Sequence, residues 1–278
     1  MNTRSLRRLI LALGITGGIV HVPVAHAQAR LDREFDQQRW LDDCKHNSWN
    51  DQERVCEIRS YGLHSSTSLD IQPGPNGGVK VRGWDRDSVA IFALVSAQAE
   101  SQGDAASLLK DVTVRVAGGK IDTDGPRTRR RQNWSVSFEI MVPRNQDIRA
   151  EAENGGISIR EVRGTMNVET VNGGLELFKV AGDVRATTVN GGLTVTLDGK
   201  KWDGKGLSAE TTNGGVRVTF PDGYAAHLRA GTTNGGFSVD FPVTIQGRFG
   251  KTLDTDLNGG GPTIRIETTN GGISLRRE

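Results

Sequence analysis

Apolar and polar positions alternate with a period of two over most of the chain after residue 65, which is the pattern of half-buried β-strands. The longest run has five alternating apolar positions, from Trp134 to Val142. Shorter runs of the same kind occur at 69–71, 79–81 and 89–93. We therefore predict an all-β fold in which the run ending at Val142 is the clearest strand.

From residue 153 onward, the alternation becomes part of a repeat. Each copy contains an apolar strand with a threonine near its end, the triplet Asn-Gly-Gly, and a second short apolar strand. Three consecutive copies are 18 residues apart, and such a fixed period indicates a repeat architecture. The triplets begin at Asn76, Asn154, Asn172, Asn190, Asn213, Asn234, Asn258 and Asn270.

The triplets allow two interpretations. Asn-Gly tolerates positive φ, so each triplet is expected to turn the chain sharply, either as a hairpin turn in an antiparallel meander or as the corner of a coil. A meander does not require identical turns or equal segment lengths, whereas here the turn and the apolar pattern recur together. We therefore predict a repetitive, parallel β-helix-like β-solenoid of ~18-residue rungs, with Asn stacked over Asn at about 4.8 Å.

Four segments follow from these patterns. We predict a signal peptide at 1–27, a helical, disulfide-linked N-terminal segment at 28–62 that caps the solenoid, a β-rich first part of the repeat domain at 63–152, and the regular solenoid at 153–278. Within the cap, Asn50 followed by Glu53 resembles a capping box and predicts a second helix. A short helix is expected over residues 104–110, and a loop over 125–131.

The first residues have the form of an export signal. Three arginines precede the short apolar stretch Leu9–Val20, and Ala25–Ala27 fits a cleavage site before Gln28. The Sec route is favoured, while Arg7-Arg8 leaves the twin-arginine route open. We expect an exported protein that is periplasmic, at the cell surface or secreted.

Composition narrows the range of partners. Residues 1–27 hold three arginines and no acidic residue, so their removal lowers Lys+Arg from 35 to 32 against 33 Asp+Glu and changes the net charge from +2 to −1. A near-neutral chain gives no reason to expect a nucleic-acid partner. The two cysteines, Cys44 and Cys56, are expected to form one disulfide in an exported protein.

The arrangement of these motifs is similar to a known family. The strand pair around Val79 and Val81, continuing to Trp84-Asp85, precedes a strand ending in Val142-Pro143 and then serial Thr-x-Asn-Gly-Gly copies. This resembles the bacterial exported β-strand-repeat proteins of unknown function that carry the label "putative adhesin". The resemblance extends from about Leu69 to the C-terminus. It implies a β-solenoid-like fold and an envelope location, and it implies no catalytic residue.

The sequence contains no recognisable catalytic or metal-binding motif, so we expect no enzyme activity, cofactor or metal. The longest acidic match, from Asp254 to Gly259, follows the first half of a calcium loop, but Arg265 stands where such loops place a glutamate. His227 is interpreted as a surface residue rather than a base. A line of carboxylates just before the turns leaves open a glycan-active site, with a solvated face as the alternative: Glu151, Glu153, Glu169, Glu210 and Glu267.

One cluster is a candidate contact patch for lipid headgroups, an acidic polymer or a cell-surface glycan. It combines a basic loop with a tryptophan that we expect to be exposed on an insertion near Lys200–Lys205: Arg127, Arg129, Arg130, Arg131 and Trp202. The preferred function is that of a non-enzymatic cell-envelope adhesin or surface scaffold. The alternatives are an accessory factor in envelope stress or assembly that acts through a protein partner, and a glycan-active enzyme.

Overall fold

The protein is represented by a computed structural model that describes residues 35–46, 52–64, 68–129, 131–242 and 250–278. The chain divides into Met1–Gln38 and a compact unit, Arg39–Glu278, that contains all the β-strands described below. The predicted signal peptide and the cleavage site before Gln28 lie outside the described residues, as does Asn50. None of the helices in the described part of the chain is long and apolar enough to cross a membrane.

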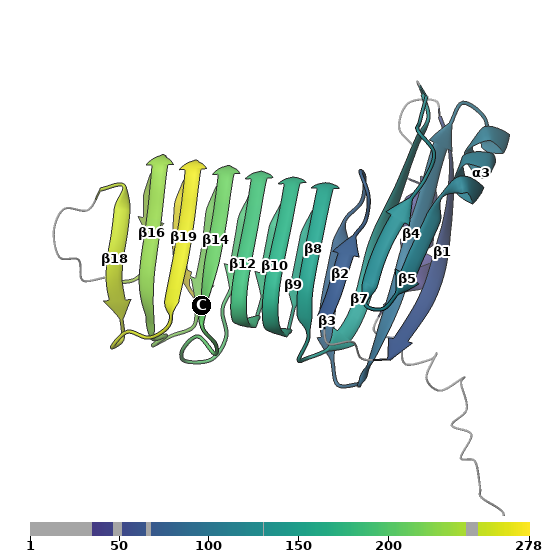
Figure 1. Ribbon diagram of the computed structural model, residues 1–278. Coiled ribbons are helices and arrows are strands. Elements are labelled where there is room, and N and C mark those ends of the chain that lie inside the picture. Colours follow the sequence, from purple (N-terminus) through teal and green to yellow (C-terminus); the bar gives the residue numbers. More distant parts are fainter. Residues whose placement is uncertain (1–34, 47–51, 65–67, 130, 243–249) are drawn as a thin grey trace, which may run out of the picture. The chain divides into compact units, whose positions relative to one another are not determined.

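The described residues of the compact unit form two ten-stranded sheets, which we call sheet A and sheet B (Figure 1). In spatial order, sheet A contains β1 (Glu53–His64), β4 (Ser88–Ala99), β7 (Asn133–Pro143), β3 (Val79–Trp84), β9 (Ile157–Arg160), β11 (Leu175–Phe178), β13 (Leu193–Thr196), β15 (Val216–Phe220), β20 (Ile273–Arg277) and β17 (Phe237–Val239). In the same way, sheet B contains β18 (Thr252–Leu257), β16 (Ala226–Asn234), β19 (Thr263–Asn270), β14 (Gly206–Asn213), β12 (Ala181–Asn190), β10 (Arg163–Asn172), β8 (Asp147–Asn154), β2 (Ser68–Gln72), β6 (Lys120–Asp124) and β5 (Thr113–Ala117). The described helices are α2 (Gln37–His46) and α3 (Gln102–Asp111). The fold is therefore nearly all-β, as the alternation predicted.

Successive strands of the repeat alternate between the two sheets and run parallel to their neighbours. In sheet B, β10 pairs with β8 and β12, and Asn172 is the partner of both Asn154 and Asn190. In sheet A, β11 pairs in the same way with β9 and β13. We call one strand of sheet B, its Asn-Gly-Gly corner and the following strand of sheet A a rung. Neighbouring rungs thus lie in register, and the meander interpretation is wrong for this region.

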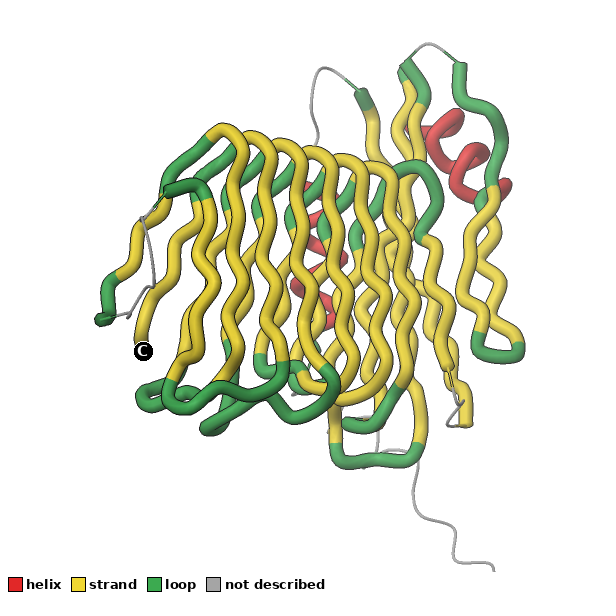
Figure 2. Tube along the Cα trace, turned by 60° about the vertical axis from the view of Figure 1, so that its left-hand side comes forward, coloured by secondary structure: helices red, strands yellow, loops and turns green. Residues whose placement is uncertain are grey.

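The strands of the rungs lie side by side (Figure 2), but their spatial order differs from their order in the sequence at both ends, as the labels of sheet B in Figure 1 show. Strands β2 and β3 lie between β6–β7 and β8–β9, although the chain passes through β6–β7 before it reaches β8. At the other end, the C-terminal strands β19 and β20 lie between β14–β15 and β16–β17. Residues 68–84 are therefore part of the same parallel stack as the regular repeats.

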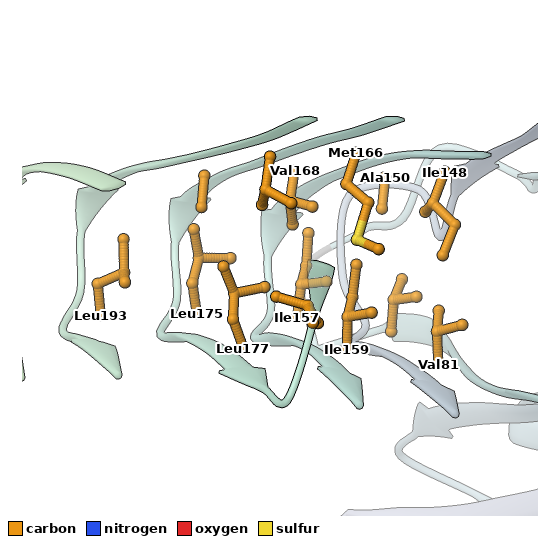
Figure 3. Packing of buried hydrophobic residues seen from close by; sticks show 14 of the residues in the cluster. Val81, Ile148, Ala150, Ile157, Ile159, Met166, Val168, Leu175, Leu177 and Leu193 are labelled. Carbon is orange, nitrogen blue, oxygen red and sulfur yellow. The ribbon is translucent and has the colours of Figure 1, made fainter. Parts of the chain in front are cut away.

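The core lies between the two sheets and is built from inward positions of each rung (Figure 3). Met166 and Val168 of sheet B and Leu175 and Leu177 of sheet A point into this core, and all four are almost fully buried. Each rung repeats this arrangement, so every apolar layer is covered by the layers on both sides. Burial of such a side chain contributes about 1.5–3 kcal/mol, and stacking makes that burial possible.

The corner glycines are required by close packing of backbones. A Cβ atom at Gly173 would lie 2.2 Å from the carbonyl oxygen of Gly155, and one at Gly191 would lie 1.9 Å from that of Gly173. These first glycines of the regular corners do not have positive φ, so the expectation of left-handed turns is wrong there. Glycine is needed because the next rung leaves no space for a side chain.

The N-terminal segment differs from the predicted pair of helices. Cys44 and Cys56 form the expected disulfide, but Cys56 lies in β1, a twelve-residue strand, so the bond joins a helix to a strand. Alternating partly buried positions pair β1 with β4 along its whole length. The local cap signal at Glu53 was overridden by this pairing. The predicted short helix is present as α3, which Ser101 caps by accepting a hydrogen bond from the amide of Asp104.

Candidate functional site

The outer face of sheet B carries side chains that repeat from strand to strand, because its parallel strands pair in register. We define three columns that cross β8, β10, β12, β14, β19 and β16. The acidic column lies three residues before the corner asparagines and contains Glu151, Glu169, Thr187, Glu210, Glu267 and Gly231. The mixed column lies two residues earlier and contains Arg149, Asn167, Arg185, Ser208, Arg265 and Arg229. The Val/Thr column lies next to the asparagines and contains Glu153, Val171, Val189, Thr212, Thr269 and Thr233.

Each glutamate of the acidic column has a hydrogen-bonding or ionic partner two residues earlier, in the mixed column. These pairs are Arg149–Glu151, Asn167–Glu169 (2.9 Å), Ser208–Glu210 (2.9 Å) and Arg265–Glu267 (2.8 Å). The hydrogen bond from Arg149 to Glu151 raises the pKa of the arginine, and the bond to Glu267 does the same for Arg265. The expected line of carboxylates thus exists, except that Glu153 belongs to the neighbouring column. Because every one of these glutamates already accepts a hydrogen bond, and two of them pair with an arginine, this line resembles a contact surface more than a set of free acids.

The Val/Thr column provides the apolar part of the face. Val171 and Val189 are 43% and 39% exposed and are the exposed large hydrophobic residues within the described ranges. They line a groove of about 400 Å³, and a second groove of about 330 Å³ follows beside Thr212 and Thr269. Thr187 lines both grooves, so they form one track along the stack. The apolar side chains of this track lie beside charged and polar ones, so the track can contact a ligand that has both apolar and polar groups.

Asparagine side chains form a hydrogen-bonded ladder at the edge of this track. Five of its asparagines donate from Nδ2 to Oδ1 of the asparagine in the neighbouring rung at 2.7–2.9 Å, and Asn154, at its end, donates to the carbonyl oxygen of Pro75 at 2.8 Å. In spatial order the ladder contains Asn154, Asn172, Asn190, Asn213, Asn270 and Asn234. The other two predicted turn residues lie outside it, because Asn76 donates to Asn133 and Asn258 donates to the carbonyl of Tyr224. The ladder holds the corners of the rungs in line.

A threonine stands two residues before the asparagine in most of the corners, and its hydroxyl group has a structural role. Thr188 is fully buried and donates to the carbonyl oxygen of Gly173 at 2.8 Å. The same bond joins Thr170 to Gly155 at 2.8 Å. A buried carbonyl without a partner would be costly, so this threonine keeps the corner intact.

The predicted contact patch does not form one surface. Arg127 and Arg129 are exposed on the loop after β6, and Arg131 lies 3.1 Å from Glu100 in an ion pair. Arg130 lies outside the described residues. The expectation of an exposed Trp202 is wrong, since this residue is 2% exposed.

Trp202 is buried because its ring joins the hydrophobic core while its indole nitrogen keeps a hydrogen-bond partner, donating to the carbonyl of Gly182 at 2.9 Å. It precedes β14, whereas the arginine loop follows β6, and four strands separate β14 from β6 in sheet B. By contrast, Trp134 is buried as expected and donates to the carbonyl of Pro126 at 3.0 Å. An insertion in the sequence was therefore a poor guide to exposure.

The acidic residues of the calcium-like sequence belong to the edge strand β18. Asp256 Oδ1 lies 2.8 Å from Nδ1 of His227, and Asp254 Oδ1 lies 3.4 Å from Nε2 of the same ring. Asp254 also pairs with Arg229 at 3.1 Å. In the described part of the chain, no group of three or more His, Cys, Asp and Glu side chains could hold a metal ion. These contacts fasten β18 to β16.

A second cleft, of about 740 Å³, lies beside Trp84 and Arg86 near the ends of β3 and β7. Arg144 Nε lies 2.6 Å from Asp85 Oδ1, and its Nη1 lies 3.0 Å from Glu161 Oε2. The hydrogen bond from Arg144 lowers the pKa of Asp85. Arg144, Asp85 and Glu161 thus bind one another at this cleft, which lacks the repetition of the sheet B face.

The Val/Thr column was not among the features predicted from the sequence. A signal was present, since Val171 and Val189 occupy outward positions of alternating strands directly before the corner asparagines. An apolar residue at an outward position is unusual enough to mark a contact surface when it recurs in neighbouring rungs.

Comparison with known proteins places the chain in a family. Residues 104–276 match the family described as Toastrack DUF4097, and this match covers more than half of the sequence. The protein therefore belongs to the Toastrack DUF4097 family. The sequence matches none of the curated proteins with which it was compared.

Several solved structures are similar over most of the chain. One is described as a "putative cell adhesion protein" from Clostridium sporogenes; it is 11% identical with a TM-score of 0.46, over 80% of this chain and 100% of the other. A "putative adhesin" from Bacteroides fragilis is 10% identical with a TM-score of 0.36, over 81% and 97%. A "putative lipid binding protein" from Parabacteroides distasonis is 8% identical with a TM-score of 0.34, over 79% and 96%. Similarity at this level adds nothing to the assignment of a ligand.

Proposed function

We propose that the protein is an exported, non-enzymatic component of the cell envelope that binds an extended ligand along the outer face of sheet B, as an adhesin or surface scaffold. We further infer that the stack acts as a β-solenoid of about 18 residues per rung, because Leu175 pairs with Leu193 and each rung rests on the next. The antiparallel strands β1 and β4, with α3, serve as its N-terminal cap.

The observation that carries the proposal is the register of the three columns. Parallel strands lie about 4.8 Å apart, so six of them place the positions of each column at equal spacing over roughly 24 Å, and four of the six positions in the acidic column are glutamates. A repeated surface of this kind matches a polymer or another repetitive ligand, because many weak contacts of equal spacing act together. The disulfide between Cys44 and Cys56 supports an oxidising, extracytoplasmic location.

A protein partner is the second candidate, and the exposed Val171 and Val189 favour it. Two neighbouring apolar side chains beside the acidic column fit a basic, partly apolar protein segment. An accessory role in envelope stress or assembly would use such a contact. The glycan-active alternative has less support, because each glutamate of the acidic column already has a partner in its own strand.

The test is binding of residues 28–278 to cell-wall glycan, to vesicles of outer-membrane lipid and to extracellular matrix proteins. The variant combines Val171→Asp with Val189→Asp, and the control is Thr194→Asp on the outer side of sheet A. We expect at least a tenfold loss of affinity for one ligand class in the double variant and no change in the control. Equal binding by all variants, or no binding to any class, would refute the proposal.

Crosslinking in cells separates the first candidate from the second. A single protein crosslinked through position 171 or 189 would favour the accessory factor. Crosslinks to wall or lipid material at those positions would favour the adhesin or scaffold.

A further inference from the structure

The C-terminal rung occupies a position that the sequence order does not require. Strands β19 and β20, Thr263–Asn270 and Ile273–Arg277, lie between the rung β14–β15 and the rung β16–β17, both of which precede them in the chain. Within the described residues, β16 pairs with β19 and β18 and not with β14. The molecule therefore contains a slot, one rung wide, that its own C-terminus fills.

The inserted rung supplies the contacts that join the two sides of this slot. Asn270 donates to Asn213 at 2.7 Å and accepts from Asn234 at 2.9 Å, which continues the ladder across the slot. Thr268 donates to the carbonyl of Gly214 at 2.8 Å on one side, while Thr232 donates to that of Gly271 at 2.9 Å on the other. All of these bonds would be identical if the rung came from another copy of the chain.

The inserted rung also carries apolar side chains that are buried in the slot. Ile264 and Ile266 are fully buried in β19, and Ile273 and Leu275 are almost fully buried in β20. An empty slot would expose the neighbouring layers, because parallel strands two positions apart are separated by roughly 9.6 Å. Occupancy of the slot is thus strongly favoured, whichever chain provides the rung.

Strand β18 prevents the simpler, sequential stacking. It pairs antiparallel with the far edge of β16, through partners such as Leu228 with Thr255. Because that edge is occupied, β19 has to reach the near side of β16. The connection from β18 to β19 therefore passes over the beginning of β16, where the amide of His227 donates to the carbonyl of Pro262 at 3.3 Å.

This connection is a hinge of five residues, from Asn258 to Pro262, with unusual backbone angles. Asn258, Gly259, Gly260 and Gly261 have φ values of 45°, 92°, 79° and 156°. Four consecutive residues with positive φ bend the chain sharply, and three of them are glycines, which have no Cβ atom to oppose such angles. The same glycines also permit an extended hinge, which would carry the rung away from its own slot. A short hinge beside a slot that is identical in every copy is a site at which domain swapping occurs.

We propose that the C-terminal rung is an exchangeable element, so that two copies of the protein form a reciprocal dimer in which Thr263–Arg277 of each chain fills the slot of the other. The partner for this surface is a second copy of the chain. This inference is independent of the ligand proposed for the outer face of sheet B.

Cysteine crosslinking in the full-length mature chain tests the exchange. Ser208 and Arg265 are register partners across the slot, so S208C in one chain and R265C in another come together only after exchange. The two single variants are mixed at high concentration in mild denaturant, returned to native buffer and oxidised. We expect a covalent dimer joining the two variants on a non-reducing gel, at several times the level of either variant alone.

A control pair and a double variant make the result decisive. N167C and R185C are partners in consecutive rungs away from the slot, and their mixture is expected to give no dimer above background. The double variant S208C/R265C shows that the geometry permits the bond, by crosslinking within one chain. Intramolecular crosslinking of the double variant without any crosslinking between S208C and R265C chains would overturn the proposal.

Shortening the hinge provides a second measurement. Deletion of Gly259 and Gly260 leaves three residues, about 10 Å of chain, to pass over β16, so the intramolecular arrangement becomes strained. We expect a shift from monomer to dimer by light scattering, with the β-sheet circular dichroism retained. A folded variant that stays monomeric would contradict the exchange.

Discussion

At the scale of single residues, backbone contact decides which positions tolerate change. The first glycine of each regular corner lies against the carbonyl group of the next rung, so its replacement forces two rungs apart. Asparagine and threonine at the same corners each make one hydrogen bond to the neighbouring rung. The triplet Asn-Gly-Gly is therefore a stacking motif rather than a turn chosen for its φ angles.

Gly173→Ala is expected to lower the free energy of unfolding by roughly 3 kcal/mol, since the added methyl group would lie 2.2 Å from a carbonyl oxygen. Gly231→Ala is the control, because a Cβ atom there meets nothing within 4 Å. Thermal unfolding of both variants is the measurement. Equal stability of the two variants would show that the stack adjusts to the extra atom.

Thr188→Val is expected to cost about 1–2 kcal/mol, because the carbonyl oxygen of Gly173 would lose its buried partner. The adjacent Thr187→Val is a matched control, since the hydroxyl of Thr187 has no hydrogen-bond partner among the described residues. The control should be neutral or slightly stabilising in urea unfolding. A similar loss in both variants would assign the effect to strand propensity instead.

Glu139 on β7 provides a prediction about pH. Its side chain is 13% exposed, and burial raises its pKa although Lys80 lies 3.9 Å away. An acid with a raised pKa in the folded state destabilises that state while it is ionised, and the penalty disappears as the pH falls through this pKa towards the unfolded value. Glu139→Gln should therefore raise the stability at pH 7.

The gain from Glu139→Gln should shrink as the pH falls and vanish below about pH 4. Unfolding temperatures of the variant and the original protein at pH 7 and pH 4 check this. Glu153→Gln, at an exposed position, is the control. A constant difference at both pH values would mean that the charge of Glu139 is not the cause.

At the scale of elements, local patterns predicted strands well and failed where pairing partners decided the outcome. The alternation ending at Val142 corresponds to β7, and the expected short helix corresponds to α3. The region around Glu53 instead became a strand, because β4 offers a partner along its whole length. A helix-capping motif involves about four residues, whereas the conformation of β1 depends on the hydrogen bonds along all twelve of its residues.

The disulfide between Cys44 and Cys56 ties α2 to β1 across a separation of 12 residues. Closing a loop of this size lowers the conformational entropy of the unfolded chain, which raises the free energy of unfolding by about 3 kcal/mol. We therefore expect dithiothreitol to lower the unfolding temperature of the protein. The double variant C44S/C56S should unfold at the lower temperature and be insensitive to the reductant.

At the scale of the whole molecule, repetition itself limits what the sequence can specify. Each rung has the same Thr, Asn and apolar positions, so any rung can stack on any other. The sequence therefore predicts stacking but not the spatial order of the rungs. The insertion of β2–β3 and of β19–β20 depends on which edges the antiparallel strands occupy. For the same reason the candidate site was found only in part, since columns arise from the register of strands far apart in the chain.

Ile266→Asp is expected to destabilise the rungs on the C-terminal side of the stack while the rungs around β10 and β11 stay stable. A buried charge in β19 disrupts the inserted rung, so amides of β16 and β17 should lose protection from hydrogen exchange while those of β10 and β11 keep it. Arg265→Asp, on the outer side of the same strand, is the control. Uniform loss of protection would show that the array unfolds as one unit.

The asparagine ladder also gives the molecule a direction. From Asn234 through Asn270 to Asn154, each amide group points its hydrogen atoms the same way, so the local dipoles add instead of cancelling. A polymer that lies along this row would therefore have different hydrogen-bonding neighbours in its two possible orientations. Binding would then select the orientation of an asymmetric chain, and a filament captured on many copies of this protein would acquire a common polarity.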